Sequence, residues 1–190
     1  MPHASGLFPA LPNFVSTIPP LDKHRPVARV QRITELISAG APLRQTLDEL
    51  VNMVESLSPA GMLGSILLLD EAGRLRHGSA PSLPDAYNAA IDGLEIGPSV
   101  GSCGTAAFHD KTVVVYDIAN DRLWANFRDL ALQHGLRACW STPIHGSDGK
   151  VIGTFANYYP VVRDPSPIDR ELTDMVTRTA ARAIEQSRKK

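Results

Sequence analysis

The chain has 190 residues, of which 43% are hydrophobic and 21% are charged, a composition typical of a globular protein. This length is enough for one domain with an extension. The formal net charge of −1 gives no broad attraction to nucleic acid or to an anionic membrane, so we expect neither as a partner.

Targeting and redox context follow from what the sequence does not contain. No apolar run approaches the roughly 18 residues of a membrane span, and the first residues lack the basic and apolar regions of a signal peptide. Two cysteines are too few for a disulfide framework. We therefore expect a cytoplasmic protein whose thiols start reduced.

The N-terminal residues differ in composition from the rest of the chain. Residues 1–25 contain five of the fifteen prolines, which oppose regular structure, together with several large apolar side chains. We predict a proline-rich N-terminal arm over residues 1–25, either docked on a surface or disordered, and a single domain over residues 26–190.

Helical spacing of apolar residues appears at both ends of this domain. It predicts two helices over residues 30–37 and 43–54, separated by a break at residues 40–42. A long final helix begins after Ser166, which is followed by a first-turn proline and by Asp169, the pattern of a capping box.

Between these helices the pattern indicates a sheet interrupted by short helices. Short apolar or β-branched runs bounded by turn residues predict strands over residues 65–70, 74–78, 112–116, 138–144 and 151–159. The remaining segments predict a short helix over residues 84–90, a glycine-rich loop over residues 97–104 and a helix over residues 121–134.

Three motifs, in this order, make the sequence more specific. They are residues 97–106, then residues 116–118 with Trp124 downstream, then residues 137–144 leading into residues 151–156. Together they resemble GAF domains, especially those of bacterial sensor kinases and diguanylate cyclases, and the resemblance spans about residues 30–187.

The resemblance implies an α/β (α+β) fold with a central antiparallel sheet of five to six strands. Terminal helices would cover one face, and a ligand pocket roofed by short helices and loops would lie on the other. It also implies a sensory module that binds a small ligand, either a small anion or a compact metabolite. We expect it to signal in trans to a protein partner and to form a homodimer through its terminal helices, residues 26–57 and 166–187.

The resemblance, combined with strand alternation, places the pocket residues. Trp140, Phe155 and Asn157 would face the terminal helices, and the residues at alternate positions of the same strands would face the pocket. A register error of one residue would exchange these two sets. The residues expected to bind ligand are Cys103, Thr105, Trp124, Phe127, Cys139, Ser141, Thr154, Ala156 and Tyr158. For the two roof aromatics, Trp124 and Phe127, ordinary core packing remains an open alternative.

Cys103 follows the glycine-rich loop and permits several interpretations. Exposed backbone N–H groups at a helix start could stabilise its thiolate or hold an anion directly, whereas most free cysteines are small buried hydrophobes. Free methionine-(R)-sulfoxide reductases share the motif at Cys103. They also have a further catalytic cysteine before the penultimate strand, whereas residues 124–135, the corresponding region of this chain, contain none. Their substrate-binding carboxylates correspond here to Cys139, Ala156 and Tyr158.

We therefore assign no catalytic residue, and two alternatives to the sensor stay open. One is a ligand-free dimeric interaction module whose pocket is filled by its own side chains. The other is a thiol redox switch, or a methionine-sulfoxide-reductase-like enzyme, that uses Cys103 together with Cys139. Histidine and cysteine spacing predicts no metal site. The sequence requires no cofactor, and haem bound through His109 or His77 is a further alternative.

Overall fold

The computed structural model describes residues 24–189. The arm predicted for residues 1–25 falls almost entirely outside this range and stays a prediction. Within the described part, the elements follow the predicted order of two helices, mixed strands and short helices, and one long final helix.

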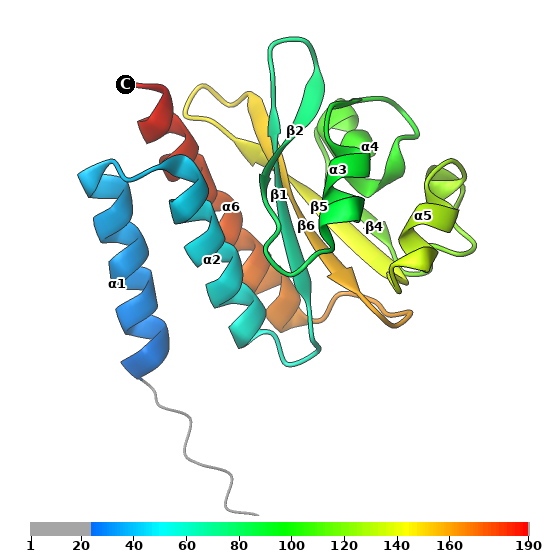
Figure 1. Cartoon of the computed structure of the whole chain (residues 1–190), viewed down its shortest axis with the longest axis horizontal. Coiled ribbons are helices and arrows are strands. Elements are labelled where there is room, and N and C mark those ends of the chain that lie inside the picture. Colours follow the sequence, from blue (N-terminus) through cyan, green and yellow to red (C-terminus); the bar gives the residue numbers. More distant parts are fainter. Residues whose placement is uncertain (1–23, 190) are drawn as a thin grey trace, which may run out of the picture.

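Six strands form a single antiparallel sheet in the order β3-β2-β1-β6-β5-β4 (Figure 1). The strands are β1 (Leu63–Leu69), β2 (Arg74–Ser79), β3 (Leu94–Glu95), β4 (Val113–Val115), β5 (Ala138–His145) and β6 (Val151–Tyr159). The longest strands, β5 and β6, pair at the centre beside β1. This sheet confirms the predicted fold class.

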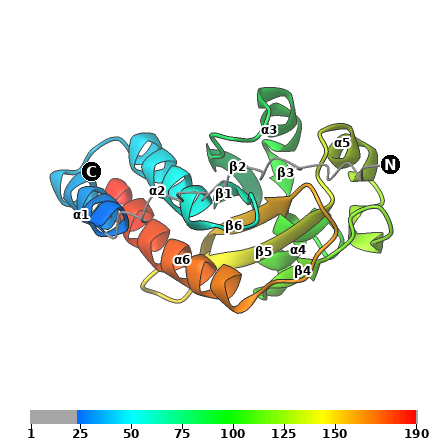
Figure 2. The same ribbon diagram turned by 90° about the horizontal axis from the view of Figure 1, so that it is seen from below.

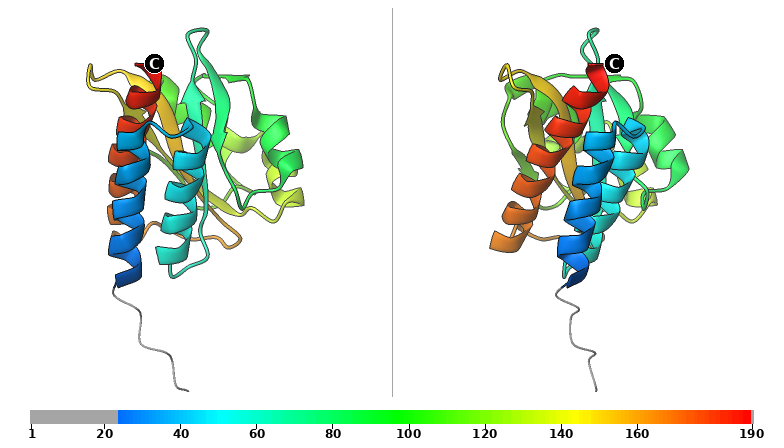
Figure 3. Two further views of the ribbon diagram at one scale, coloured as in Figure 1. Left: turned by 60° about the vertical axis from the view of Figure 1, so that its left-hand side comes forward. Right: turned by 90° about the vertical axis from the view of Figure 1, so that its left-hand side faces the viewer.

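Helices cover the two faces of the sheet unequally (Figure 2). One face, called here the helical face, carries the long helices α1 (His24–Ala39), α2 (Leu43–Leu57) and α6 (Pro167–Arg188). Helix α1 lies on the outer side of α2, away from the sheet (Figure 3). The other face, called the pocket face, carries α3 (Asp85–Ile91), α4 (Gly101–His109), the 3₁₀-helix η1 (Arg122–Trp124) and α5 (Arg128–Gln133).

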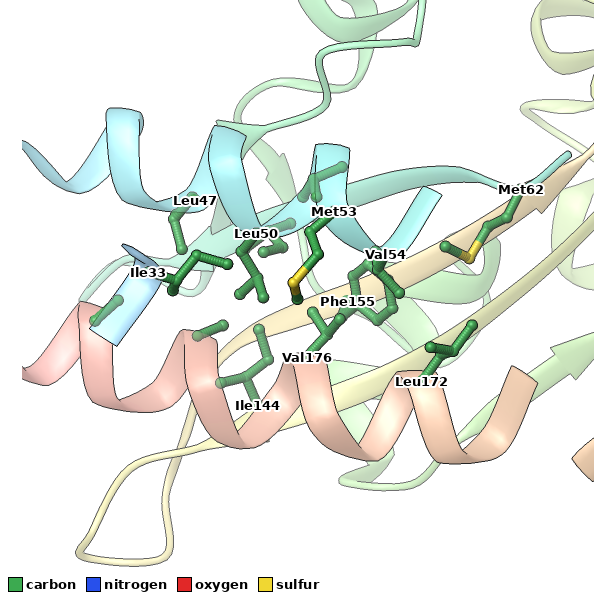
Figure 4. Close-up of a cluster of buried hydrophobic side chains, with 14 of the residues drawn as sticks. Ile33, Leu47, Leu50, Met53, Val54, Met62, Ile144, Phe155, Leu172 and Val176 are labelled. Carbon is green, nitrogen blue, oxygen red and sulfur yellow. The ribbon is translucent and has the colours of Figure 1, made fainter. Parts of the chain in front are cut away.

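The core on the helical face explains why α2 and α6 pack where they do. Their apolar stripes meet between the helices and the sheet, where Leu50, Phe155 and Val176 are almost completely buried (Figure 4). Ser166 and Asp169 form the predicted capping box at the start of α6. Helix α6 is thus fixed directly against β5 and β6, and α2 against β1, β2 and α6.

Three details differ from the sequence prediction. The two-residue strand β3 was not predicted, because a pair of residues carries no readable alternation. The helix expected over residues 121–134 is split into η1 and α5, since the backbone leaves helical geometry at Phe127 (φ −123°, ψ −4°). Helix α4 begins inside the predicted loop, at Gly101, whose φ of +54° suits glycine.

Candidate functional site

The pocket face carries the side chains that the resemblance and strand alternation together assigned to it. Cys139, Ala156 and Tyr158 belong to a buried cluster with residues of the roof. On the opposite side, Trp140 and Phe155 join the core beneath α2 and α6. The Asn157 amide donates to Thr173 Oγ1 of α6 at 2.9 Å. The predicted register of β5 and β6 is therefore confirmed.

A small cavity lies where the roof meets the sheet. The space open to the centre of a water-sized sphere is about 30 Å³, and one water needs roughly 10–15 Å³ of such space. Mostly apolar residues surround it: Leu67, Leu75, Tyr87, Ile91, Leu94, Val100, Gly101, Ser102, Cys103, Gly104, Trp124, Phe127 and Tyr158. The cavity as it stands holds about two or three waters, so a larger ligand needs the roof to move.

Local sequence explains how the roof reaches the cavity. The Asp121 carboxylate accepts from Leu123 N at 2.8 Å and starts η1, which turns Trp124 inward until it is 3% exposed. The Trp124 ring lies over Gly101, where a Cβ would make ordinary contact at 3.8 Å. The glycine at this position is therefore explained by its φ of +54° and not by lack of space.

Two short polar chains cross this buried region. Tyr87 Oη donates to Tyr158 Oη at 3.3 Å, and Tyr158 Oη lies 3.9 Å from Cys103 Sγ. In the second chain, Trp124 Nε1 donates to Ser102 Oγ at 3.1 Å, and Ser102 Oγ donates to the Cys139 carbonyl at 3.1 Å. Both chains join the roof to β5 or β6 through groups that are hidden from water.

The ionisable groups here have strongly shifted properties. Hydrogen bonding from the Cys139 thiol is the main cause that lowers the pKa of Cys103 to about 7, against the opposing effect of burial. Burial raises the pKa of Cys139 well above its usual value. Burial likewise raises the pKa values of Tyr87 and Tyr158, so both phenols stay protonated and can donate.

The residues predicted to bind ligand fall into two groups. Cys103, Trp124, Phe127 and Tyr158 line the cavity. The other five lie outside its lining, packed between α4 and the sheet: Thr105, Cys139, Ser141, Thr154 and Ala156. Contact between a ligand and any of the nine stays a prediction.

One member of the second group has a clear local role. Thr105 Oγ1 accepts from Val100 N at 3.0 Å, which holds the glycine-rich loop against the first turn of α4. Sequence reasoning missed Tyr87, whose position on the predicted short helix was visible but whose inward direction was not. It also missed the cavity side chains Leu67 and Leu75, which strand alternation along β1 and β2 could have found.

The histidines considered for haem lie away from the cavity lining. His109 is exposed at the end of α4 and packs edge-on to Phe108. His77 is half-buried on β2, where its backbone N–H donates to Asp92. His134, by contrast, packs edge-on against Tyr87 at 5.7 Å between ring centroids. Within residues 24–189, no group of three His, Cys, Asp or Glu side chains gathers as metal ligands would.

A second polar cluster links the sheet to α6 on the helical face. Asp169, 1% exposed, accepts from Tyr159 Oη at 2.7 Å and from Arg163 Nη2 at 2.6 Å. The Arg163 guanidinium lies over the rings of Trp140 and Tyr159, at 5.2 and 4.3 Å from their centroids. Burial alone would raise the pKa of Asp169, but hydrogen bonds from Ser166 and Tyr159 and the charge of Arg163 lower it.

Comparison with known proteins identifies a related sensor sequence. The chain is 39% identical over 155 residues to a methyl sulfide methyltransferase-associated sensor of Methanosarcina acetivorans; the match covers 81% of this chain but 15% of that protein. The chain therefore spans only a small part of that relative. No helix among residues 24–189 has the length and apolar character needed to cross a membrane.

Solved structures with low sequence identity share the fold. A putative GAF sensor protein from Burkholderia vietnamiensis matches with a TM-score of 0.64 and 19% identity, covering 87% of this chain and 97% of that one. The GAF domain of a phosphoenolpyruvate-protein phosphotransferase from Coxiella burnetii matches with a TM-score of 0.68 and 15% identity, covering 87% of this chain and 96% of that one. The protein fRMsr of Staphylococcus aureus matches with a TM-score of 0.63 and 19% identity, covering 85% of this chain and 94% of that one.

The family model described as GAF domain matches residues 40–185, from the start of α2 to the last turns of α6. This range includes the whole sheet, both roof segments and the cavity. The chain belongs to the GAF domain family.

Proposed function

We propose that the chain is a sensory GAF module that binds a small ligand in the cavity beneath α4 and η1. The observation that carries the proposal is the cavity itself, where an apolar lining meets the hydroxyl of Tyr158 and the thiol of Cys103. The chain is 39% identical to a methyl sulfide methyltransferase-associated sensor, and this similarity supports a sensory role.

The lining limits what this ligand can be. None of its residues carries a formal charge at neutral pH apart from the Cys103 thiol, so the ligand meets neutral donors and apolar walls. The starting volume of about 30 Å³ favours a small anion or a compact metabolite. Such a ligand displaces Trp124 and the loop before α4, because these segments line the space. Binding therefore selects a conformation with a rearranged roof.

The sheet provides a route from the cavity to α6. Adjacent residues of one strand point to opposite faces, so a shift at Tyr158 also moves Tyr159. Tyr159 in turn donates to Asp169 in the first turn of α6. We propose that α6 transmits the change to a protein partner, and that the terminal helices also join two copies of the chain.

A ligand screen on the purified, reduced protein tests the proposal. Native mass spectrometry would detect a copurified ligand, and thermal shifts would be measured with nitrate, nitrite, cyclic nucleotides, amino acids, methionine sulfoxide and haem. A ligand at 100 times its dissociation constant stabilises by about 2.7 kcal/mol, which for a domain of this size raises the melting temperature by about 5–10 °C.

The variant Trp124→Ala is expected to change the affinity for that ligand, whereas the exposed control Thr112→Ala, at the edge of the sheet, is expected to leave it unchanged. An apo mass with no selective shift would contradict the sensor. It would favour a module that acts through its dimer surface, with its pocket filled by its own side chains.

A further inference from the structure

The two cysteines of the chain meet in the buried layer between α4 and the sheet. Cys103 is 8% exposed at the start of α4, and Cys139 is fully buried on β5. Their positions are fixed from both sides: Ser102 donates to the Cys139 carbonyl, and Tyr158, opposite Cys139 in the β5–β6 pair, lies 3.9 Å from Cys103 Sγ. Both cysteines belong to one buried cluster, and these two contacts bring the start of α4 onto the segment of β5 that carries Cys139.

Hydroxyl groups surround Cys103 in a way that suits an anion. Ser141 Oγ and Thr154 Oγ1 are fully buried and have no hydrogen-bond partner, although an orphaned buried hydroxyl is costly. Ser141 follows Cys139 on the same face of β5, Thr154 lies on the paired strand β6, and Tyr158 Oη is 3.9 Å from Cys103 Sγ. Hydroxyl groups placed in this way lower the pKa of Cys103. A thiolate at Cys103 gives these donors the acceptor that they otherwise lack.

We propose that Cys103 and Cys139 form a reversible disulfide when a small peroxide enters the cavity, with Cys103 as the attacking thiolate and Cys139 as the resolving thiol. The order follows from position. Cys103 lines the cavity, whereas Cys139 lies outside the lining. This redox function goes beyond ligand binding and does not depend on it, because the thiol pair is complete without a bound ligand.

The reaction proceeds in two balanced steps. The Cys103 thiolate attacks one peroxide oxygen, the O–O bond breaks, and the departing oxygen takes a proton and leaves as water or an alcohol. Cys139 then attacks the sulfur of the Cys103 sulfenic acid, a disulfide forms, and the sulfenic hydroxyl leaves as water with the Cys139 proton. Two thiols are oxidised and one peroxide is reduced; an external dithiol reverses the change by exchange.

The cavity selects the oxidant by size. A space of about 30 Å³ beside Cys103 admits hydrogen peroxide, which is slightly larger than water, before it admits a bulky hydroperoxide. We expect hydrogen peroxide to oxidise the folded protein at least tenfold faster than cumene hydroperoxide. Unfolding would remove this difference.

The disulfide would also change the roof. A covalent bond between the start of α4 and β5 removes the thiol near Tyr158 and alters the Ser102 contact that holds Trp124. The structural change on oxidation would therefore reach α6 through β5 and β6, the strands on which this helix packs. Intrinsic tryptophan emission should report it, because Trp124 is buried against α4.

The test uses the full chain, reduced and then treated with hydrogen peroxide, quenched, unfolded and alkylated. The expected product is a monomer that has lost about 2 Da and both alkylatable thiols, restored by dithiothreitol. In Cys139→Ser, dimedone should trap a sulfenic acid at Cys103. In Cys103→Ser, no disulfide can form, and Cys139 should stay reduced because it does not line the cavity. Circular dichroism confirms that each variant is folded, with Cys103→Ala and Cys139→Ala as substitutes.

Matched hydroxyl variants test the role of the donors. Ser141→Ala should slow oxidation about tenfold by removing a donor to the thiolate. The control Ser65→Ala removes another fully buried, unpartnered hydroxyl, on β1 opposite Ala156, and should not change the rate. Two alkylatable thiols after peroxide, an intermolecular disulfide, or dimedone labelling of Cys139 in place of Cys103 would overturn the proposal. None of these results depends on the ligand screen.

Discussion

The Asp169 cluster offers the sharpest test of how α6 is held on the sheet. In Asp169→Ala, Tyr159 loses its acceptor, Arg163 loses its ion pair and Ser166 loses the reciprocal cap. Removing one member of a buried ion pair costs about 3–5 kcal/mol. The Arg163 side chain is 19% exposed and can be partly rehydrated, so we expect the lower end, about 3 kcal/mol.

That loss corresponds to a fall in melting temperature of about 6–12 °C for a domain of this size. Urea denaturation at pH 7 would measure it, with Asp169→Asn as the control that keeps an acceptor for Tyr159 but removes the charge. The asparagine variant should lie between the wild type and the alanine variant. A cost below about 1 kcal/mol would refute the reasoning, because it would mean that the cluster holds little of α6.

The same cluster gives a pH dependence of defined sign. The pKa of Asp169 is lowered in the folded chain, so its contribution is present above the unfolded value of about 3.9 and disappears as pH falls through the folded value. The difference in stability between the wild type and Asp169→Ala should therefore shrink below about pH 4. A difference that stays constant down to pH 2 would contradict this assignment.

Three further predictions concern the sheet and the thiol. In Gly153→Ala the new Cβ would overlap the Leu67 carbonyl, so we expect a loss of about 1–3 kcal/mol in urea denaturation. The control Gly97→Ala meets only the Val100 side chain, and an equal loss there would refute the steric explanation. Tyr158→Phe leaves the buried Tyr87 hydroxyl unpaired and should cost about 1–3 kcal/mol in urea denaturation; an unchanged stability would contradict this pairing. Formation of a mixed disulfide between Cys103 and a small thiosulfonate, with release of sulfinate, should reach half its maximal rate near pH 7, and Cys139→Ala should move that midpoint upward. A midpoint near 8.5 in the wild type would contradict the effect assigned to Cys139.

The motifs and roof segments predicted Cys103, Trp124 and Phe127, three of the four predicted residues that line the cavity, and strand alternation predicted the faces of β5 and β6. Both faces of β5 and β6 are buried, and successive side chains point to opposite faces, so Trp140 and Tyr158 fall on opposite sides of the sheet once the strands are paired. The capping box at Ser166 was likewise readable, because it is made by residues three positions apart. Such features are local, and local spacing is what a sequence displays.

The rest depended on contacts between distant segments. The meeting of Cys103 with Cys139, 36 positions later, requires the packing of α4 on β5, which no spacing encodes. The inward turn of Trp124 breaks a segment whose apolar pattern reads as one helix, because burying the ring against Ser102 outweighs helical continuity. Tyr87 belongs to the cavity for the same reason: its partner, Tyr158, lies 71 positions away.

Communication between the cavity and α6 is the central claim, and amide hydrogen exchange measures it most directly. Exchange would be compared with and without the compound that gives the largest thermal shift, in the wild type and in Asp169→Asn. We predict slower exchange in the roof, in β5 and β6, and in the first turns of α6, with the α6 effect reduced in the variant. Protection confined to the roof, with α6 unchanged in the wild type, would contradict the proposed route.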